Sequence, residues 1–314
     1  MSLIEDLKSL PKIDLHINLL SSLSIDFVSR TNELSYEDIL DLTSYRKYYD
    51  DQKSLELPKN ILSDEKNIRE AIQDLIVKNK ENNVVYSEVY LDPMLYNRDL
   101  DYDYTLNIIN KFINEEHYPL KIVLILSDKF SREENINIIE LGKKYNNLVT
   151  AYYFNKDKMT NLSDYDYLFD KIKRDNLKYI VSYDSKVNGL NRDIYSNSYR
   201  LIINEEFNED ILEIIKVNNL ICEFQLSKLN TYNDLYHIID TLIDNNYLVT
   251  NTTNDRTIMN TDMLNESCIL FNNANITLRV YVKEMIMIIK ALNISDNEKD
   301  KLIDIIINQS NDIL

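Results

Sequence analysis

The chain has 314 residues, of which 44% are hydrophobic, and its 35 basic and 52 acidic residues give a formal net charge of −17 at pH 7. This charge argues against nucleic-acid backbones and anionic membranes as partners, because like charges repel. Two cysteines, Cys222 and Cys268, are too few for a disulfide framework. No apolar run reaches the ~18 residues of a membrane span, and no basic start precedes an apolar signal segment. We therefore expect a cytoplasmic protein.

Short apolar runs alternate with amphipathic stretches along the whole chain. Strands are predicted at residues 11–16, 84–91, 120–126, 148–154, 177–183, 199–203, 220–226 and 247–252. Near-continuous apolar runs such as residues 122–126 suit strands that are buried on both faces. Helical patterns lie between the strands at residues 132–145, 165–175, 206–218 and 233–245, and more helix follows to the C-terminus.

Eight strands that alternate with helices predict a parallel α/β sheet, and the number eight favours closure into a (β/α)8 TIM-type barrel. An open, doubly wound sheet is the structural alternative. Residues 30–83 are too long for one connecting helix, and we interpret them as a helical insertion over the barrel mouth, after the first strand. The insertion either covers a ligand or only adds packing helices. We thus expect one barrel domain over residues 1–314, with extra C-terminal helices.

Glycine is scarce, with Gly142 and Gly189 as the only two. A Gly-rich phosphate loop and a dinucleotide-binding fingerprint are therefore excluded. Asparagine is abundant, and it adopts the left-handed conformation more readily than other non-glycine residues. We expect asparagine to serve as the turn residue, for example at 146–147, 218–219, 245–246 and 272–273.

The first predicted strand carries the most informative residues. Residues 10–19 read Leu-Pro-Lys-Ile-Asp-Leu-His-Ile-Asn-Leu, and residues i and i+2 of a strand share a face, so His16 and Asn18 point the same way. The segment resembles the opening strand of the adenosine deaminase family, Pro-Lys-x-(Glu/Asp)-Leu-His-x-His, whose two histidines bind a catalytic zinc ion. Here Asn18 stands in the second position, and a carboxamide oxygen is a poor zinc ligand.

The resemblance continues in sequence order. Residues 84–93 are similar to the family's second strand, Val-x-Tyr-x-Glu-x-Arg-x-x-Pro, with Tyr90 in place of the arginine, and residues 140–149 look like the helix that leads into its fourth strand. The resemblance implies a barrel that hydrolytically deaminates a purine. Zinc activates the attacking water, a glutamate acts as acid and a further histidine assists, all at the carboxyl ends of the strands.

Most positions that the family uses for this chemistry are occupied by other residues. On the fifth strand Ser182 stands in place of a zinc histidine and Ser185 in place of the catalytic glutamate. On the sixth strand Ile203 takes the position of the assisting histidine. On the eighth strand Asn254 replaces the zinc aspartate, and Asp255 survives beside it.

The number of histidines also argues against the family's zinc site, because the family mechanism uses four histidines and this chain has three. His117 and His237 are predicted on the surface or in helix packing, so His16 alone is left as a candidate zinc ligand. A tetrahedral zinc site needs roughly three or four good ligands. We therefore expect no metal cofactor, with zinc or another divalent metal as the alternative.

Other residues near the predicted strand ends have two interpretations each. Asp92, Asp184 and Asp255 could hold Mg²⁺ or Mn²⁺, since hard cations favour oxygen ligands, or they could cap the following helices. Tyr183, together with the tyrosines at 90 and 153, could stack on a flat base or could fill the core. Glu88 is interpreted as structural, with Arg279 or a lysine as its partner.

Three hypotheses for the function follow. The first is a barrel without hydrolytic activity that keeps a pocket for a purine nucleoside or base, with Asp184, Asp255 and Tyr183 as candidate binding residues. The second is an active metal-dependent hydrolase whose site is rebuilt around His16, Asp184 and Asp255. The third is an interaction protein that uses the barrel exterior, where the acidic surface would suit basic partners.

Overall fold

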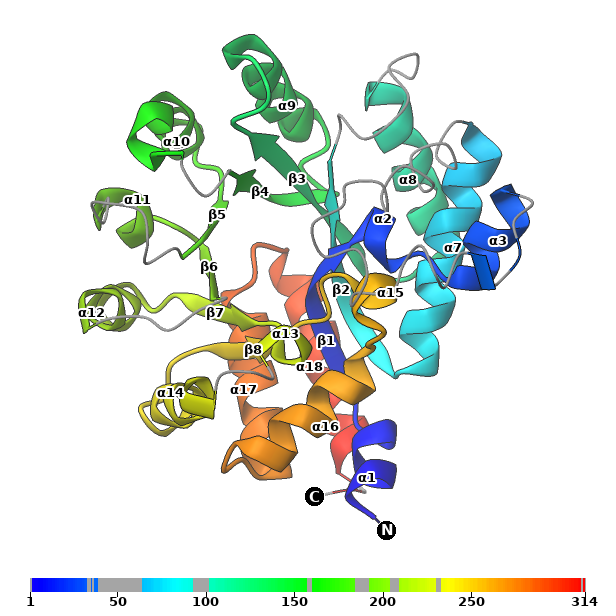
Figure 1. Cartoon of the computed structure of the whole chain (residues 1–314), viewed down its shortest axis with the longest axis vertical. Coiled ribbons are helices and arrows are strands. Elements are labelled where there is room, and N and C mark those ends of the chain that lie inside the picture. The colour runs from blue at the N-terminus through cyan, green and yellow to red at the C-terminus, as the bar shows by residue number, and fades with distance from the viewer. Residues whose placement is uncertain are drawn as a thin grey trace.

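The computed structural model describes residues 2–32, 35, 37–38, 64–92, 102–156, 160–183, 192–203, 209–229, 233–311 and 313. Its strands form one eight-stranded sheet in sequence order, and every neighbouring pair is parallel. The strands are β1 (Lys12–Asn18), β2 (Val84–Leu91), β3 (Leu120–Ser127), β4 (Val149–Asn155), β5 (Tyr179–Ser182), β6 (Arg200–Ile203), β7 (Ile221–Phe224) and β8 (Val249–Asn251). Figure 1 shows them as a ring surrounded by helices.

The ring is joined between the first strand and the segment that follows the last one. Ile17 and Asn254 form an isolated parallel bridge. The backbone N–H of Asn254 donates to the carbonyl of His16 at 2.7 Å, and that of Asn18 donates to the carbonyl of Asn254 at 2.9 Å. The predicted (β/α)8 barrel is therefore confirmed.

Helices precede, connect and follow the strands. Those between the second and eighth strands are α8 (Tyr102–Glu116), α9 (Arg132–Lys144), α10 (Asp166–Arg174), α11 (Arg192–Ser196), α12 (Glu209–Asn218), α13 (Leu226–Leu229) and α14 (Asn233–Asp244), together with a short 3-10 helix, η3 (Leu162–Tyr165). Earlier in the chain lie α1 (Leu3–Ser9), α2 (Leu19–Ser22), α3 (Ile25–Asn32) and α7 (Glu65–Glu81). Residues 33–34, 36 and 39–63 of the predicted insertion at 30–83 lie outside the described residues.

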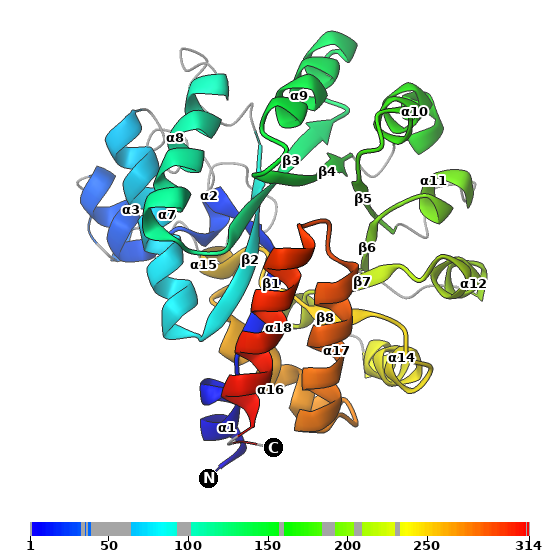
Figure 2. The same cartoon turned by 180° about the vertical axis from the view of Figure 1, so that it is seen from behind.

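The extra C-terminal helices are α15 (Arg256–Met259), α16 (Met263–Asn273), α17 (Leu278–Ala291) and α18 (Asp296–Ser310). Figure 2 shows α17 and α18 running side by side across the ring as seen from behind. Asn293, in the turn between them, donates from its side chain to the carbonyl of Thr150 at 2.7 Å. This turn therefore lies at the amino end of β4. No helix in the described ranges is both long and apolar enough to span a bilayer.

Burial explains why the strands read as near-continuous apolar runs. Outward-facing residues such as Ile122, Leu124 and Leu126 pack into a large cluster between the sheet and the helices. The alternate residues form a second cluster inside the ring, made of Tyr90, Val123, Ile125, Ala151, Ile180 and Ile202. Both faces are thus buried, as parallel sheets require, and the middle of the barrel is filled by side chains.

Asparagine takes the role that glycine usually has in tight turns. The described non-glycine residues with a positive φ are His117 and six asparagines, at positions 83, 176, 219, 246, 254 and 260. Asn219 and Asn246 belong to pairs that the sequence predicted as turns. The short polar side chain of asparagine lowers the steric cost of this conformation by bonding locally, which lets the chain fold with very few glycines.

Candidate functional site

His16 is held on three sides at the carboxyl end of β1. Its Nδ1 lies 3.2 Å from Oε2 of Glu223 on β7. Its ring stacks on Tyr90 of β2, with centroids 3.7 Å apart and planes 10° apart. The ring of Tyr153, on β4, lies 6.1 Å from that of His16 and 5.4 Å from that of Tyr90. With 6% of its surface exposed, the imidazole is held by a carboxylate at hydrogen-bond distance and by two aromatic rings.

Below His16, a chain of buried charges crosses the barrel interior. Arg200 on β6 places Nη2 2.7 Å from Oε2 of Glu88 and Nε 2.8 Å from Oε1 of Glu223, and all three side chains are fully buried. Tyr86 donates its hydroxyl to Glu88 at 2.7 Å. Burial alone would lower the pKa of Arg200, but the charges of Glu88 and Glu223 raise it well above its ordinary value. The partner of Glu88 is thus Arg200, and our prediction of Arg279 or a lysine was wrong.

The residues at the other family zinc positions bond to neighbours. Asn18 donates from Nδ2 to Oδ1 of Asp255 at 3.2 Å, and the Ser21 hydroxyl donates to the same oxygen. Asn254 donates from Nδ2 to Gln225 at 3.1 Å. The Ser182 hydroxyl lies 2.9 Å from the hydroxyl of Tyr153. The structure therefore brings the positions 16, 18, 182, 254 and 255 to one end of the barrel.

This donor set does not fit a zinc ion. Structural and catalytic zinc sites use three or four thiolate, imidazole or carboxylate ligands, and these positions offer two, the imidazole of His16 and the carboxylate of Asp255. The amides of Asn18 and Asn254 and the hydroxyl of Ser182 are weak ligands for this metal. Within the described ranges, no group of three or more His, Cys, Asp or Glu side chains is arranged to hold a metal ion.

Several predicted site residues lie elsewhere. Tyr183 is 3% exposed and packs 6.2 Å from the ring of Tyr195 on α11, in the outer cluster. Ile203 also belongs to the outer cluster, whereas its neighbour Ile202 faces the interior. Because alternate residues of a strand face opposite sides, the inward position at this end of β6 is that of Ile202. Asp184 and Ser185 lie outside the described residues.

The two remaining histidines do not approach His16. His117 follows α8 with a φ of 52°, and His237 lies on α14; both are exposed. This agrees with their prediction as surface residues. Asp92 follows β2 and is half-buried.

Glu223 and Arg200 are the residues that our sequence reasoning missed. Each is a charged residue inside a short apolar run, and ionised side chains are almost never fully buried unless they are paired. That signal marks both as partners in an interior ion pair. It does not say which strands face each other across the barrel, so the contact with His16 had to come from the fold.

No protein-family model matches the sequence, and no curated protein matches it. Solved structures do. The structure of an ADAL–IMP complex has a TM-score of 0.83 at 15% identity and covers 98% of this chain and 99% of its own. The N6-methyl-AMP deaminase from Arabidopsis thaliana has the same values. An adenine deaminase from Arthrobacter aurescens has a TM-score of 0.75 at 11% identity, covering 95% and 98%.

Each of these three matches covers nearly the entire length of this chain and nearly the entire length of the other protein. At such low identity the likeness concerns the fold, and the site has to be judged on the residues described above. The chain has the barrel fold of the adenosine deaminase-like enzymes, as its first strand predicted.

Proposed function

We propose that this protein is a purine-binding barrel of the adenosine deaminase type that does not carry out zinc-dependent deamination. The observation that carries the proposal is the surroundings of His16, the single histidine at the family's metal position. Its Nδ1 faces Glu223, one ring face lies on Tyr90, and the other ligand positions hold two amides and a hydroxyl. Without a Lewis acid, water near pH 7 is a weak nucleophile.

Polar acceptors at the same end of the barrel support a purine as ligand. Asn18, Asn254 and Asp255 are half-buried. Their side-chain hydrogen bonds to described residues use the amide nitrogens and one carboxylate oxygen. Both amide oxygens and the second carboxylate oxygen accept no hydrogen bond from a described residue. Three such acceptors suit the N–H groups on the edge of an oxopurine. ADAL structures with bound IMP and bound GMP have this fold.

The catalytic half of the proposal is tested by metal content and turnover. We expect protein expressed with added zinc to purify with well below one equivalent of metal. We also expect no deamination of adenosine, adenine, AMP or N6-methyl-AMP, with or without added Zn²⁺ or Mn²⁺. Metal-restored turnover that His16→Ala abolishes would instead establish the alternative, a hydrolase rebuilt around His16, Asp184 and Asp255.

The binding half is tested by calorimetry with IMP, GMP and inosine. Asp255→Asn replaces an acceptor by a donor at nearly constant shape, and we expect it to weaken purine binding about tenfold or more, since a lost hydrogen bond to a charged group costs about 1.5–3 kcal/mol. Asp164→Asn, at an exposed position of η3, is the matched control and should bind as the parent does. Absence of binding by all three compounds would refute this half and leave the first intact.

A further inference from the structure

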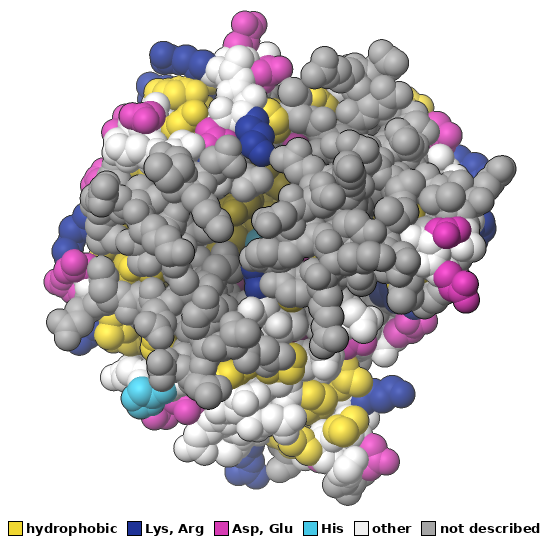
Figure 3. Space-filling view, viewed as in Figure 1, with side chains coloured by type: hydrophobic (Ala, Val, Ile, Leu, Met, Phe, Trp, Pro, Cys, Tyr) yellow, Lys and Arg dark blue, Asp and Glu magenta, His cyan; other side chains and the backbone are white. Residues whose placement is uncertain are grey.

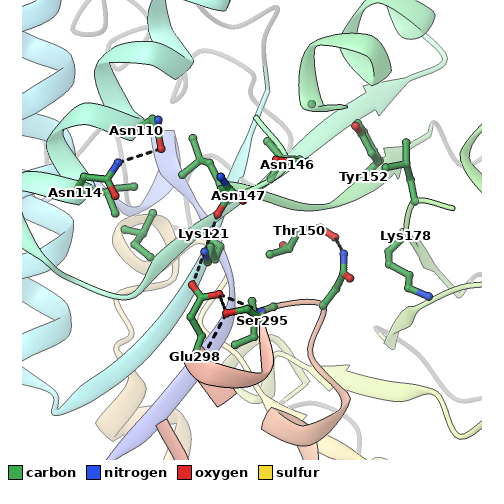
Figure 4. A pocket seen from close by; sticks show the side chains of 18 of the residues that line it. Asn110, Asn114, Lys121, Asn146, Asn147, Thr150, Tyr152, Lys178, Ser295 and Glu298 are labelled. Atoms are coloured by element: carbon green, nitrogen blue, oxygen red, sulfur yellow. Dashed lines mark hydrogen bonds and ion pairs between the residues drawn. The ribbon is translucent and has the colours of Figure 1, made fainter. Parts of the chain in front are cut away.

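A large pocket lies at the end of the barrel opposite His16. Its volume is about 580 Å³, and it is lined by residues at the amino ends of β3 and β4, by the end of α8, and by the turn between α17 and α18. Figure 4 shows Lys121 between Asn147 and Glu298 among the side chains that line the pocket. Pockets of ~300–1,000 Å³ are the usual size for small-molecule ligands.

A second pocket of about 400 Å³ adjoins the first, because residues 176–178 line both. It follows the amino ends of β6 and β7 through Tyr199 and Ile221. The hydroxyl of Tyr199 accepts from the backbone N–H of Asn293, which lines the first pocket, at 2.7 Å. We call the two pockets together the amino-end groove. It is defined by the residues that line the pockets, at the amino ends of β3 to β7.

The groove is locally basic although the chain as a whole is strongly acidic. Its lining contains three lysines, at 121, 173 and 178, and one carboxylate, Glu298. Glu298 lies 2.6 Å from the Nζ of Lys121, which neutralises it. Lys173 forms ion pairs with two aspartates, its Nζ lying 3.4 Å from Oδ1 of Asp170 and 3.5 Å from Oδ2 of Asp193. Lys178 makes no ion pair with a described residue, so its charge is available to an anion. The opposite face of the molecule is shown in Figure 3, where basic and acidic side chains are interspersed around the described rim.

The groove also presents amides that are not used inside the protein. The side chains of Asn146, Asn147 and Asn176 line it, and none of them hydrogen-bonds to a described residue. Their backbones, in contrast, are held in place. Lys121 donates to the carbonyl of Asn147 at 2.7 Å, and Asn176 adopts a positive φ of 55° in a turn. Exposed side-chain amides that offer both donors and acceptors suit a ligand that carries several hydroxyl groups.

We propose that the amino-end groove binds a small phosphorylated polyol, of the sugar phosphate class. The phosphate lies against Lys178, where the two pockets meet, and the hydroxyl groups lie against the asparagine amides of the larger pocket. The site is separate from the one at the carboxyl ends of the strands, and it does not depend on the function proposed above.

The experiment is calorimetric titration of the intact chain with glucose 6-phosphate, ribose 5-phosphate, glucose and inorganic phosphate. We expect at least one of the sugar phosphates to bind one to one, and more tightly than glucose or phosphate alone. Lys178→Ala should weaken that binding about tenfold or more, as loss of a charged hydrogen bond does, and Lys178→Arg should retain most of it. Asn147→Ala should weaken the sugar phosphate and leave phosphate unchanged.

Lys111→Ala is the matched control, because Lys111 is an exposed lysine on α8 outside the groove lining, and we expect it to change nothing. Lys178→Ala should also leave purine binding at the opposite end unchanged. The proposal is overturned if neither sugar phosphate binds, if inorganic phosphate binds as tightly as both, or if Lys178→Ala binds like the parent chain.

Discussion

Arg200 lowers the free-energy cost of burying two carboxylates inside the barrel. It bridges Glu88 and Glu223, which come from strands on different sides of the ring, and Glu223 continues the chain of contacts to His16. An unpaired carboxylate in such a place would cost several kcal/mol in lost hydration. One guanidinium from the chain itself therefore offsets part of the negative charge of these two carboxylates.

This argument predicts a large effect for Arg200→Met. The substitution keeps much of the side-chain volume and leaves two buried carboxylates without their guanidinium partner, so we expect the free energy of unfolding in urea to fall by about 3–5 kcal/mol. Arg192→Met removes a similarly short arginine–glutamate pair, 2.8 Å from Glu213, that is exposed to water. Its effect should be small. Equal losses of unfolding free energy in the two variants would show that burial does not explain how much the Arg200 pair contributes to stability.

The protonation of Glu266 is expected to make the stability of the fold depend on pH. It is buried and accepts the N–H groups of Leu226 and Ser227 at 2.8 and 3.1 Å and the hydroxyl of Thr261 at 2.8 Å. Burial outweighs these bonds and raises its pKa from 4.5 to about 7. The folded state therefore keeps the proton more tightly than the unfolded chain. The stabilisation is complete below about pH 4.5 and is lost as the pH rises to about 7.

We expect the parent chain to lose about 3 kcal/mol at most through this group between pH 4.5 and 7. Glu266→Gln keeps an acceptor oxygen for the two N–H groups and has no proton to lose. Unfolding in urea at pH 5 and pH 8 should thus show a smaller pH-dependent fall for Glu266→Gln than for the parent. Glu133→Gln, at an exposed position on α9, should behave as the parent does. A Glu266→Gln profile parallel to the parent's would contradict the raised pKa.

At the scale of single elements, the packing of α9 on β4 depends on one glycine. A Cβ at Gly142 would lie 2.2 Å from the hydroxyl of Tyr152 and 2.8 Å from its ring. That tyrosine is 2% exposed, and its hydroxyl donates to the carbonyl of Ile139 at 2.8 Å, so it has little room to move. The glycine is required by close approach of the strand, although glycine is a poor helix former.

Gly142→Ala should consequently destabilise the chain, although alanine favours helices by about 1 kcal/mol at a free position. We expect overpacking to lower the free energy of unfolding by about 1–3 kcal/mol. The same substitution in a Tyr152→Leu background removes the obstructing ring and should be neutral or stabilising. Thermal unfolding of the four chains in this double-mutant cycle measures the coupling. A coupling near zero would place the cause outside this contact.

The elements were largely predictable because strand and helix periodicities are local. The predicted strand at 84–91 has the observed bounds. The helices predicted at 132–145 and 233–245 begin where predicted, and in the structure each ends one residue before the predicted end. Orientation at strand ends was harder. The sequence placed Ile203 at the family's histidine position, while the inward residue there is Ile202. A shift of one residue exchanges the two faces of a strand, and low identity does not fix that register.

At the scale of the whole molecule, the barrel closes where the candidate site lies. The seam consists of the bridge between Ile17 and Asn254, and Asn254 adopts a φ of 51° to make it. The same residue occupies a family zinc position and bonds to Gln225. Closure and site geometry therefore depend on one backbone conformation, which could not be predicted from sequence because the bridge joins residues more than 200 positions apart.

This seam gives a prediction for the whole barrel. Asn254→Gly and Asn254→Ala both remove the hydrogen bond to Gln225. They differ in the steric cost of a positive φ, which alanine has and glycine does not. We expect the alanine variant to be less stable than the glycine variant by about 1–2 kcal/mol. The amide of Asn18, which donates across the seam at 2.9 Å, should exchange with deuterium faster in the alanine variant. The same pair of substitutions at Asn246, whose φ is 59° in the turn before β8, should show the stability difference without faster exchange at Asn18. Faster exchange in both alanine variants would mean that the barrel opens as one unit, with no special weakness at the seam.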